Sequence, residues 1–324
     1  MQEVTKSTLV SATKDSSEAD LNHKPERTLG EYAYAVIAEQ YQQVIRQEKK
    51  VLADKGPEPV HQMRVGTRRL RTALQVFGRS ITLPKEAQEK QISNLTHVLG
   101  ELRDLDVQTS ELTHTYRPRL NSMEQTLLDK AAKTLHRHRR KAFAKTEATL
   151  TRSRYQDLKA AYEQWLEQPQ YTPIAQLPLL SLIPDLLHPL LSQVLLHPGW
   201  LSHADNSSES SNNALHDLRK VCKQVRYQAE FFACFYGEAF QNWVEEIKTI
   251  QSQLGQLHDS QVLSDLLKNE LSKHSELPEF QAVLKQVQAE AMADWETIRH
   301  QYLNPSFRQQ LHQIILKPTL SVSV

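Results

Sequence analysis

Two stretches of this chain share one spacing of basic residues: VHQMRVGTRRLRTALQVF at residues 60–77 and LHDLRKVCKQVRYQAEFF at residues 215–232. Each contains the pattern His-x-x-Arg-x-x-x-Arg/Lys-x-x-Arg, with apolar residues between the basic ones. The motif residues are His61, Arg64, Arg68 and Arg71 in the first copy and His216, Arg219, Lys223 and Arg226 in the second. Intervals of three and four residues follow one face of an α-helix, so both stretches predict helices with a basic face opposite an apolar face.

A second pair of motifs repeats at the same offset of 155 residues. LGELRDLDV at residues 99–107 corresponds to LGQLHDSQV at residues 254–262. Two separate motifs that agree on one offset indicate an internal duplication. A single amphipathic helix pair cannot bury its apolar stripe, so each half is predicted to form a bundle of about four helices. The acid that both copies keep, Asp104 and Asp259, is predicted to anchor an arginine or to cap a chain reversal rather than to act in catalysis.

The basic faces have two possible explanations. Like charges three or four residues apart destabilise an isolated helix by a few tenths of a kcal/mol per pair. Residues 59–79 contain no acid that could relieve this repulsion, and Lys220 extends the second stripe. A solvated surface face would explain one such stripe. Because the same stripe recurs at the repeat offset, histidine included, an anionic partner with regularly spaced charge is the favoured explanation.

The first half carries a further basic surface. Residues 119–168 follow Pro118 and contain neither proline nor glycine, so they predict one long helix. The alternative is two helices that meet near Ser153. Its apolar side carries Leu128, Ala131 and Leu135. The candidate ligand-binding residues on the opposite side are Lys133, Arg137, Arg140 and Lys141. The second half lacks most of these cations at the repeat offset, but Arg299, which corresponds to Ala144, restores one and is a further candidate.

The rest of the chain reads as an all-α protein. Further helices are predicted at about 29–56, 59–80, 85–115, 214–236, 239–273 and 279–316. Residues 1–28 and 317–324 are predicted tails, 29–168 the first bundle and 214–316 the second. Between the bundles, 169–213 is a proline-rich connection with short helices such as 186–196 and a polar linker at 202–213.

Composition narrows the possible functions. The eight glycines are scattered, which excludes the clustered glycines of a dinucleotide-binding fingerprint or a P-loop, so no cofactor is implied. Neither the two cysteines nor the histidines have the spacing of a metal site. The absence of a signal peptide and of long apolar runs favours a cytoplasmic protein without membrane contact. The formal charge of +1 divides into +7 for residues 29–168 and −5 for residues 174–317, so the first half is expected to dominate anion binding.

The duplicated basic motif, each copy followed by Leu-Gly-x-Leu-x-Asp, resembles the CHAD domain family over about residues 29–316. The resemblance implies two four-helix bundles related by a pseudo-two-fold axis, with a basic groove or pore between them. It also implies binding of inorganic polyphosphate through the motif residues, in some relatives with targeting to polyphosphate granules. His258 stands where the first copy has Arg103.

Two alternatives remain at this stage. Charge alone does not distinguish phosphate polymers, so single-stranded RNA is a possible ligand. Against it, the basic stripes contain one aromatic residue, Tyr227, whereas base recognition uses aromatic stacking platforms. An enzyme that processes phosphate polymers is the other alternative, but no paired nucleophile and base is present in the sequence.

Overall fold

The two basic motifs lie on equivalent helices, α3 (Pro57–Phe77) and α8 (Glu209–Phe232), and the two Leu-Gly motifs on α4 (Glu89–Glu111) and α9 (Glu238–Glu270). Gly56 precedes α3 with φ of +83°, a backbone conformation that side chains other than glycine rarely adopt. Pro57 then starts the helix at the position where a missing N–H costs nothing. In α8 the Ser208 side chain caps the first turn by accepting a hydrogen bond from the Ser211 N–H.

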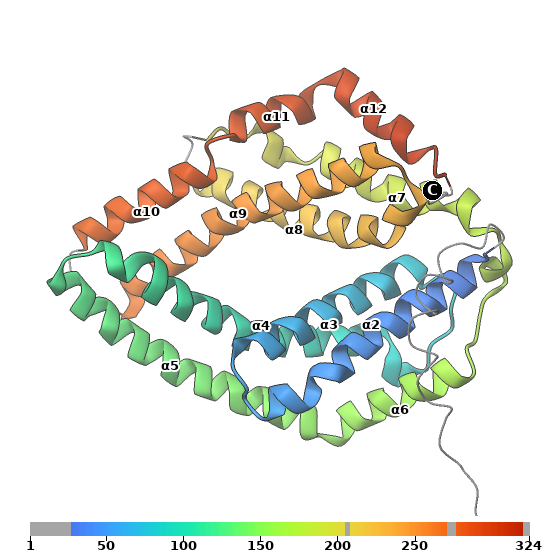
Figure 1. The fold of residues 1–324 in the computed structure, drawn as a ribbon, viewed down its shortest axis with the longest axis horizontal. Coiled ribbons are helices and arrows are strands. Elements are labelled where there is room, and N and C mark those ends of the chain that lie inside the picture. The colour runs from blue at the N-terminus through green and yellow to red at the C-terminus, as the bar shows by residue number, and fades with distance from the viewer. Residues whose placement is uncertain (1–26, 205–207, 271–276, 320–324) are drawn as a thin grey trace, which may run out of the picture.

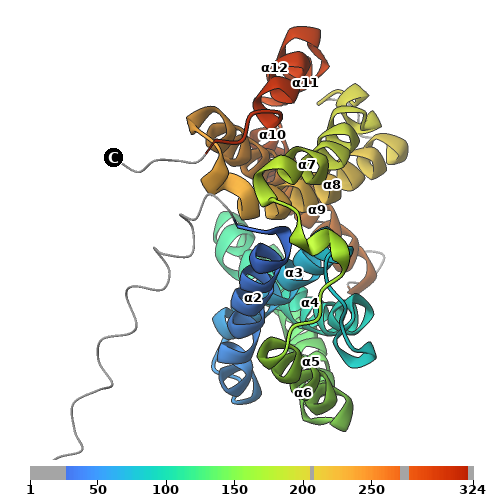
Figure 2. The same ribbon diagram turned by 90° about the vertical axis from the view of Figure 1, so that its right-hand side faces the viewer.

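The computed structural model describes residues 27–204, 208–270 and 277–319. Within these ranges the chain is all-α, as predicted, and pairs as β-structure only in two isolated bridges. The predicted tails 1–28 and 317–324 lie largely outside the described residues, as do positions 205–207 of the predicted linker and the last residues of the helix predicted at 239–273. Figure 1 shows α2–α6 on one side and α7–α12 on the other, and the turned view of Figure 2 shows the same division.

The first half adds α2 (Leu29–Leu52), α5 (Ser122–Thr151) and α6 (Ser153–Glu167). A capping box at Thr28 and Glu31 starts α2. Helix α3 packs closely on α2 because Gly66 has no side chain: a Cβ there would lie 3.1 Å from Val44 Cγ2. Arg152 is extended between α5 and α6, so the long predicted helix is broken beside Ser153.

The second half adds α7 (Leu179–Leu195), α10 (Pro278–Ala291), α11 (Trp295–Leu303) and α12 (Pro305–Ile315). The sequence predicted one helix over 279–316, and this was wrong. The chain turns after Ala291, where the Trp295 ring is buried against Trp200 and its indole N–H donates to the Ser202 carbonyl over 2.8 Å. It turns again at Asn304, whose side chain caps α12 before Pro305.

Helix α7 also differs from the prediction of short apolar helices, since it runs through Pro184 and Pro189. Its buried residues recur every three or four positions, and the prolines lie off that face. The stretch Leu179–Leu201 is long and apolar enough to cross a membrane by composition. In this fold α7 packs against α8 and α12, so burial of its apolar face supports the helix despite the two missing N–H groups.

The two halves meet at both ends of the molecule. At one end Phe77 of α3 contacts Phe231 and Phe232 of α8, with Tyr32 of α2 stacked on Phe232. At the other end an apolar cluster joins residues from both halves, including Tyr116 and Phe280, whose ring centroids are 5.2 Å apart. These contacts leave the middle of the interface between α3, α4, α8 and α9 open.

A reciprocal carboxylate contact strengthens the second of these ends. Glu124 of α5 is buried and accepts hydrogen bonds from the backbone N–H groups of Glu279 and Phe280 at the start of α10, over 2.9 and 2.8 Å. Glu279 in turn accepts from the Asn121 N–H at the start of α5, over 2.6 Å. Glu124 and Glu279 are 155 residues apart, the offset of the repeat, and each carboxylate lies at a helix N-terminus of the other half, where negative charge is favoured.

Candidate anion-binding cavity

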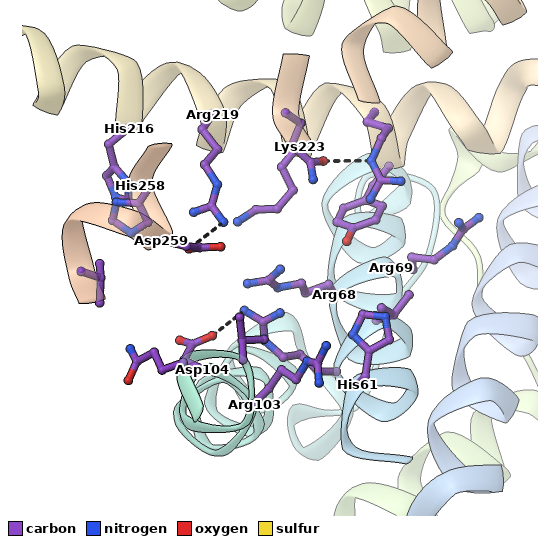
Figure 3. A pocket seen from close by; sticks show the side chains of 18 of the residues that line it. His61, Arg68, Arg69, Arg103, Asp104, His216, Arg219, Lys223, His258 and Asp259 are labelled. Carbon is purple, nitrogen blue, oxygen red and sulfur yellow. Dashed lines mark hydrogen bonds and ion pairs between the residues drawn. The ribbon is translucent and has the colours of Figure 1, made fainter. Parts of the chain in front are cut away.

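A cavity of about 630 Å³ lies between the halves, bounded by α3 and α4 on one side and by α8 and α9 on the other. Figure 3 shows His216, Arg219 and Lys223 extending from α8 toward Arg68 of α3 and toward Arg103 and Asp104 of α4. Seven arginine and lysine side chains line the cavity against three carboxylates. The cations are Arg64, Arg68, Arg69, Arg103, Arg219, Lys223 and Arg226, and the acids are Asp104, Glu230 and Asp259. The cavity therefore carries a surplus of positive charge.

The shared aspartates pair with the first arginine of each motif. Asp104 contacts Arg64 over 3.3 Å and Asp259 contacts Arg219 over 3.7 Å, which confirms that each anchors an arginine. The glycine of each Leu-Gly motif lies beside the same guanidinium: a Cβ on Gly100 would be 3.7 Å from Arg64 Nε, and one on Gly255 would be 3.5 Å from Arg219 Nε. The repeated motifs therefore place the same three residues together in both halves, with the glycine beside the arginine that the aspartate holds.

Three cations of the cavity have no acidic partner among the described residues: Arg68, Arg103 and Lys223. No hydrogen bond or ion pair connects any of them to a side chain in those ranges. Burial, together with repulsion from Arg68 and Arg219, lowers the pKa of the Lys223 ammonium to about 7. Burial and the nearby Arg68 also lower the pKa of Arg64 to about 10. Burial first, and repulsion among neighbouring cations second, thus oppose the charged forms of both side chains.

The histidines of the motifs point into the same cavity. The Nδ1 atoms of His61 and His216 are buried without a hydrogen-bond partner in the described part of the chain. The ring of His216 lies against that of His258, with centroids 4.0 Å apart. Burial and the neighbouring His258 lower the pKa of His216 to about 4. The pKa of His258 is lowered by burial and Arg219, and that of His61 by burial and Arg103. An anion would reverse the repulsive part of these shifts.

Glu230 closes one end of the cavity. It receives Arg69 of α3 over 2.6 Å and Arg226 of its own helix over 3.0 Å, so one carboxylate neutralises two guanidinium groups and links the halves. Arg226 also covers the ring of Tyr227, with its guanidinium carbon 4.4 Å from the ring centroid. On α4, burial and the charge of Asp259 raise the pKa of Glu111 to about 7.

Seven of the candidate residues from the sequence come together in the cavity: His61, Arg64, Arg68, His216, Arg219, Lys223 and Arg226. The others do not line it. Arg71 pairs with Glu89, and Lys220 pairs with Asp217 over 2.9 Å. Arg299 is only 6% exposed, on α11, where it pairs with Glu296 and contacts His203.

The basic residues of α5 lie elsewhere. Lys133, Arg137, Arg140 and Lys141 are exposed to solvent. The face of α5 that packs into the protein carries Leu128, Ala131 and Leu135, as the sequence predicted. These four cations belong to the outer surface of the first half and do not reach the cavity between the halves.

Several residues that line the cavity were not among the candidates predicted from the sequence. Arg103 and His258 occupy equivalent positions of the Leu-Gly motif. A basic or titratable residue at that position in both copies was a signal that could have identified them. Arg69, Gln108 and Gln251 carried none. Arg69, for example, is placed by its contacts with Gln40 and Glu230, which lie 29 and 161 residues away.

Comparisons with known proteins identify the family of the chain. The CHAD domain family model matches residues 35–268, and the chain belongs to this family. The family is linked in general to polyphosphate binding. A search of curated proteins finds no match.

Two solved structures share the fold. The crystal structure of the CHAD domain from the plant Ricinus communis has 22% identity and a TM-score of 0.59, over 92% of this chain and 96% of that one. PptA from Streptomyces chartreusis has 14% identity and a TM-score of 0.60, over 87% of this chain and 99% of that one.

Proposed function

We propose that this CHAD protein binds linear inorganic polyphosphate in the cavity between its two halves, without hydrolysing it. The observation that carries the proposal is a set of three cations, Arg68, Arg103 and Lys223, which three helices contribute to one cavity and which have no acidic partner in the described part of the chain. Motif cations three or four residues apart are separated by about 4.5–6 Å along a helix. A linear polymer with a negative charge on every unit can contact several of them at once.

Phosphate polymers without bases fit this lining better than RNA. Among the residues that line the cavity, Tyr227 is the one with a phenyl or indole ring, and it is 7% exposed with Arg226 over its face. It therefore offers no open platform for base stacking. We further propose that the exposed cations of α5 contact the outer part of a long chain, and that the protein acts in the cytoplasm, where such binding would bring it to polyphosphate granules.

The decisive experiment measures binding of long-chain polyphosphate by calorimetry for the native protein, Arg68→Glu and Arg46→Glu. Arg46 is exposed on α2, away from the cavity, so the control makes the same charge change. We expect a loss of at least tenfold for Arg68→Glu and less than twofold for Arg46→Glu, since a charged contact contributes about 1.5–3 kcal/mol. Equal losses would overturn the proposed site.

Two further measurements separate the alternatives. Single-stranded RNA at equal phosphate concentration should not displace polyphosphate; ready displacement would favour nucleic-acid binding. Incubation with polyphosphate and Mg²⁺ or Mn²⁺ should release no phosphate; sustained release would favour an enzyme.

A further inference from the structure

The cavity contains basic side chains that burial and neighbouring cations keep from binding protons. Lys223 extends from α8 into the space between the halves and meets charged groups from all four surrounding helices. These are Arg64 and Arg68 on α3, Asp104 on α4, Arg219 on α8, and His258 and Asp259 on α9. Both aspartates are already paired with arginines, so Lys223 meets an excess of positive charge.

The second half contains another such group, the adjacent rings of His216 and His258, which are tilted by 36° with centroids 4.0 Å apart. The charged groups around this pair are mostly basic. They are Lys220 and Arg219 with the acid Asp217 on α8, Lys223 from the same helix, and Asp104 from α4. The first copy differs, because Arg103, which is always charged, stands where the second has His258.

We infer that entry of a polyanion into this cavity is coupled to proton uptake by Lys223 and the His216–His258 pair, so that pH sets the affinity of the site. This inference rests on the proposed function. A bound polyanion brings negative charge among these groups and favours their protonated forms. The protons come from solvent, and the protein gains positive charge as it gains ligand.

The direction of the pH dependence follows from the coupling between proton binding and polyanion binding. Lys223 has a pKa near 7 in the empty cavity. Above that pH the ammonium is mostly neutral, and binding must restore its proton, so affinity falls as pH rises. One proton taken up corresponds to at most a tenfold change in affinity per pH unit. The histidine pair extends this dependence to lower pH, because the pKa of His216 in the empty cavity is about 4.

The test is calorimetric titration with long-chain polyphosphate at pH 8 and pH 6 in two buffers that differ in ionisation enthalpy. The difference between the two heats gives the number of protons taken up. Internal phosphates of a long chain stay ionised at both pH values, so the ligand contributes little. At pH 8 we expect uptake of about one proton per bound site and an affinity several-fold lower than at pH 6.

Variants assign the protons. Lys223→Arg keeps the positive charge but does not titrate, so uptake at pH 8 should fall close to zero while binding persists. Lys248→Arg, paired with Glu245 on the exposed side of α9, is the matched control and should leave uptake unchanged. His216→Asn/His258→Asn should reduce the uptake at pH 6. Circular dichroism checks the fold of each variant.

Binding with no proton uptake at pH 8, or with uptake that Lys223→Arg leaves intact, would overturn the inference and leave the proposed function standing. Absence of binding at both pH values would overturn the proposed function and with it the inference.

Discussion

The two halves surround the cavity with equivalent helices but supply different cations. At matching positions the first half has Arg68 and Arg103, whereas the second has Lys223 and His258. Arginine stays charged in any protein environment, whereas lysine and histidine lose their protons when they are buried among other cations. At these two positions the first half therefore presents a fixed charge and the second a charge that depends on pH and on the ligand.

The difference is sharpest for a matched pair of charge reversals. Arg68→Glu/Arg103→Glu should lower polyphosphate affinity about a hundredfold or more at pH 8, since two charged contacts are lost. The equivalent Lys223→Glu/His258→Glu should cost about tenfold, because both groups are largely neutral in the empty cavity at that pH. Calorimetry across a salt series measures both. Equal losses would show that the halves contribute equally.

The halves also differ at their reciprocal carboxylate contact. Glu124→Ala should lower the free energy of unfolding by about 2 kcal/mol, because it leaves two N–H groups at the buried start of α10 without acceptors. Glu279→Ala should cost about 0.5 kcal/mol, since Glu279 is exposed and accepts one bond. Urea denaturation of both variants tests this. A larger loss for Glu279→Ala would contradict the assignment.

Removing the charge of Lys223 alone should reveal how its contribution to polyphosphate affinity depends on pH. Lys223→Met should weaken polyphosphate binding about tenfold at pH 6 and only about twofold at pH 8. At pH 6 the Lys223 ammonium is charged before the ligand enters, whereas at pH 8 the native protein must first take up a proton. The difference in affinity between the native protein and the variant is therefore smaller at pH 8. Binding isotherms at the two pH values give the comparison. A loss that grows with pH would be contrary to this reasoning.

Making the second half resemble the first should strengthen it. His258→Arg recreates the first copy's pairing of histidine with arginine, and we expect about threefold tighter binding at pH 8 from the added fixed charge. The reciprocal Arg103→His should weaken binding at the same pH. If His258→Arg has no effect while Arg103→His weakens binding, the ligand does not contact the position of His258.

The smallest effect is expected on α5. Arg137→Glu/Arg140→Glu should change the affinity for tripolyphosphate by less than about twofold, because these exposed charges are screened by salt and lie outside the cavity. The sequence had placed both residues among the candidate ligand-binding residues. A loss comparable to that of Arg68→Glu would return α5 to the binding site for short chains.

Much of the fold could be predicted because the deciding signals are periodic. The apolar spacing of α3 and α8 and the repeat offset indicated the helices that bound the cavity. The turn after Ala291 could not be predicted, since no proline or glycine marks it and the cause is burial of Trp295 against Trp200. The prediction of two bundles with a pseudo-two-fold relation stays a prediction.

The candidate site was predictable in part for a similar reason. A helical wheel shows which residues share a face but not which element that face meets, so the basic sides of α3 and α5 looked alike. Arg71 pairs with Glu89 of α4, 18 residues away, and does not line the cavity. A helical wheel of α3 cannot show this pairing because Glu89 lies on another helix. Arg299 was different, because Glu296 stands three residues before it and its pairing could have been read from the sequence.

The exchange of carboxylates between α5 and α10 has a consequence for how such a chain can arise. Each repeat carries both a helix start that needs an acceptor and a glutamate that can serve as one, so the contact is self-complementary. A chain with a single copy could form the same joint with a second molecule, in the manner of an isologous dimer. Joining the copies in one polypeptide makes the partner permanently present, and closure of the cavity no longer depends on protein concentration.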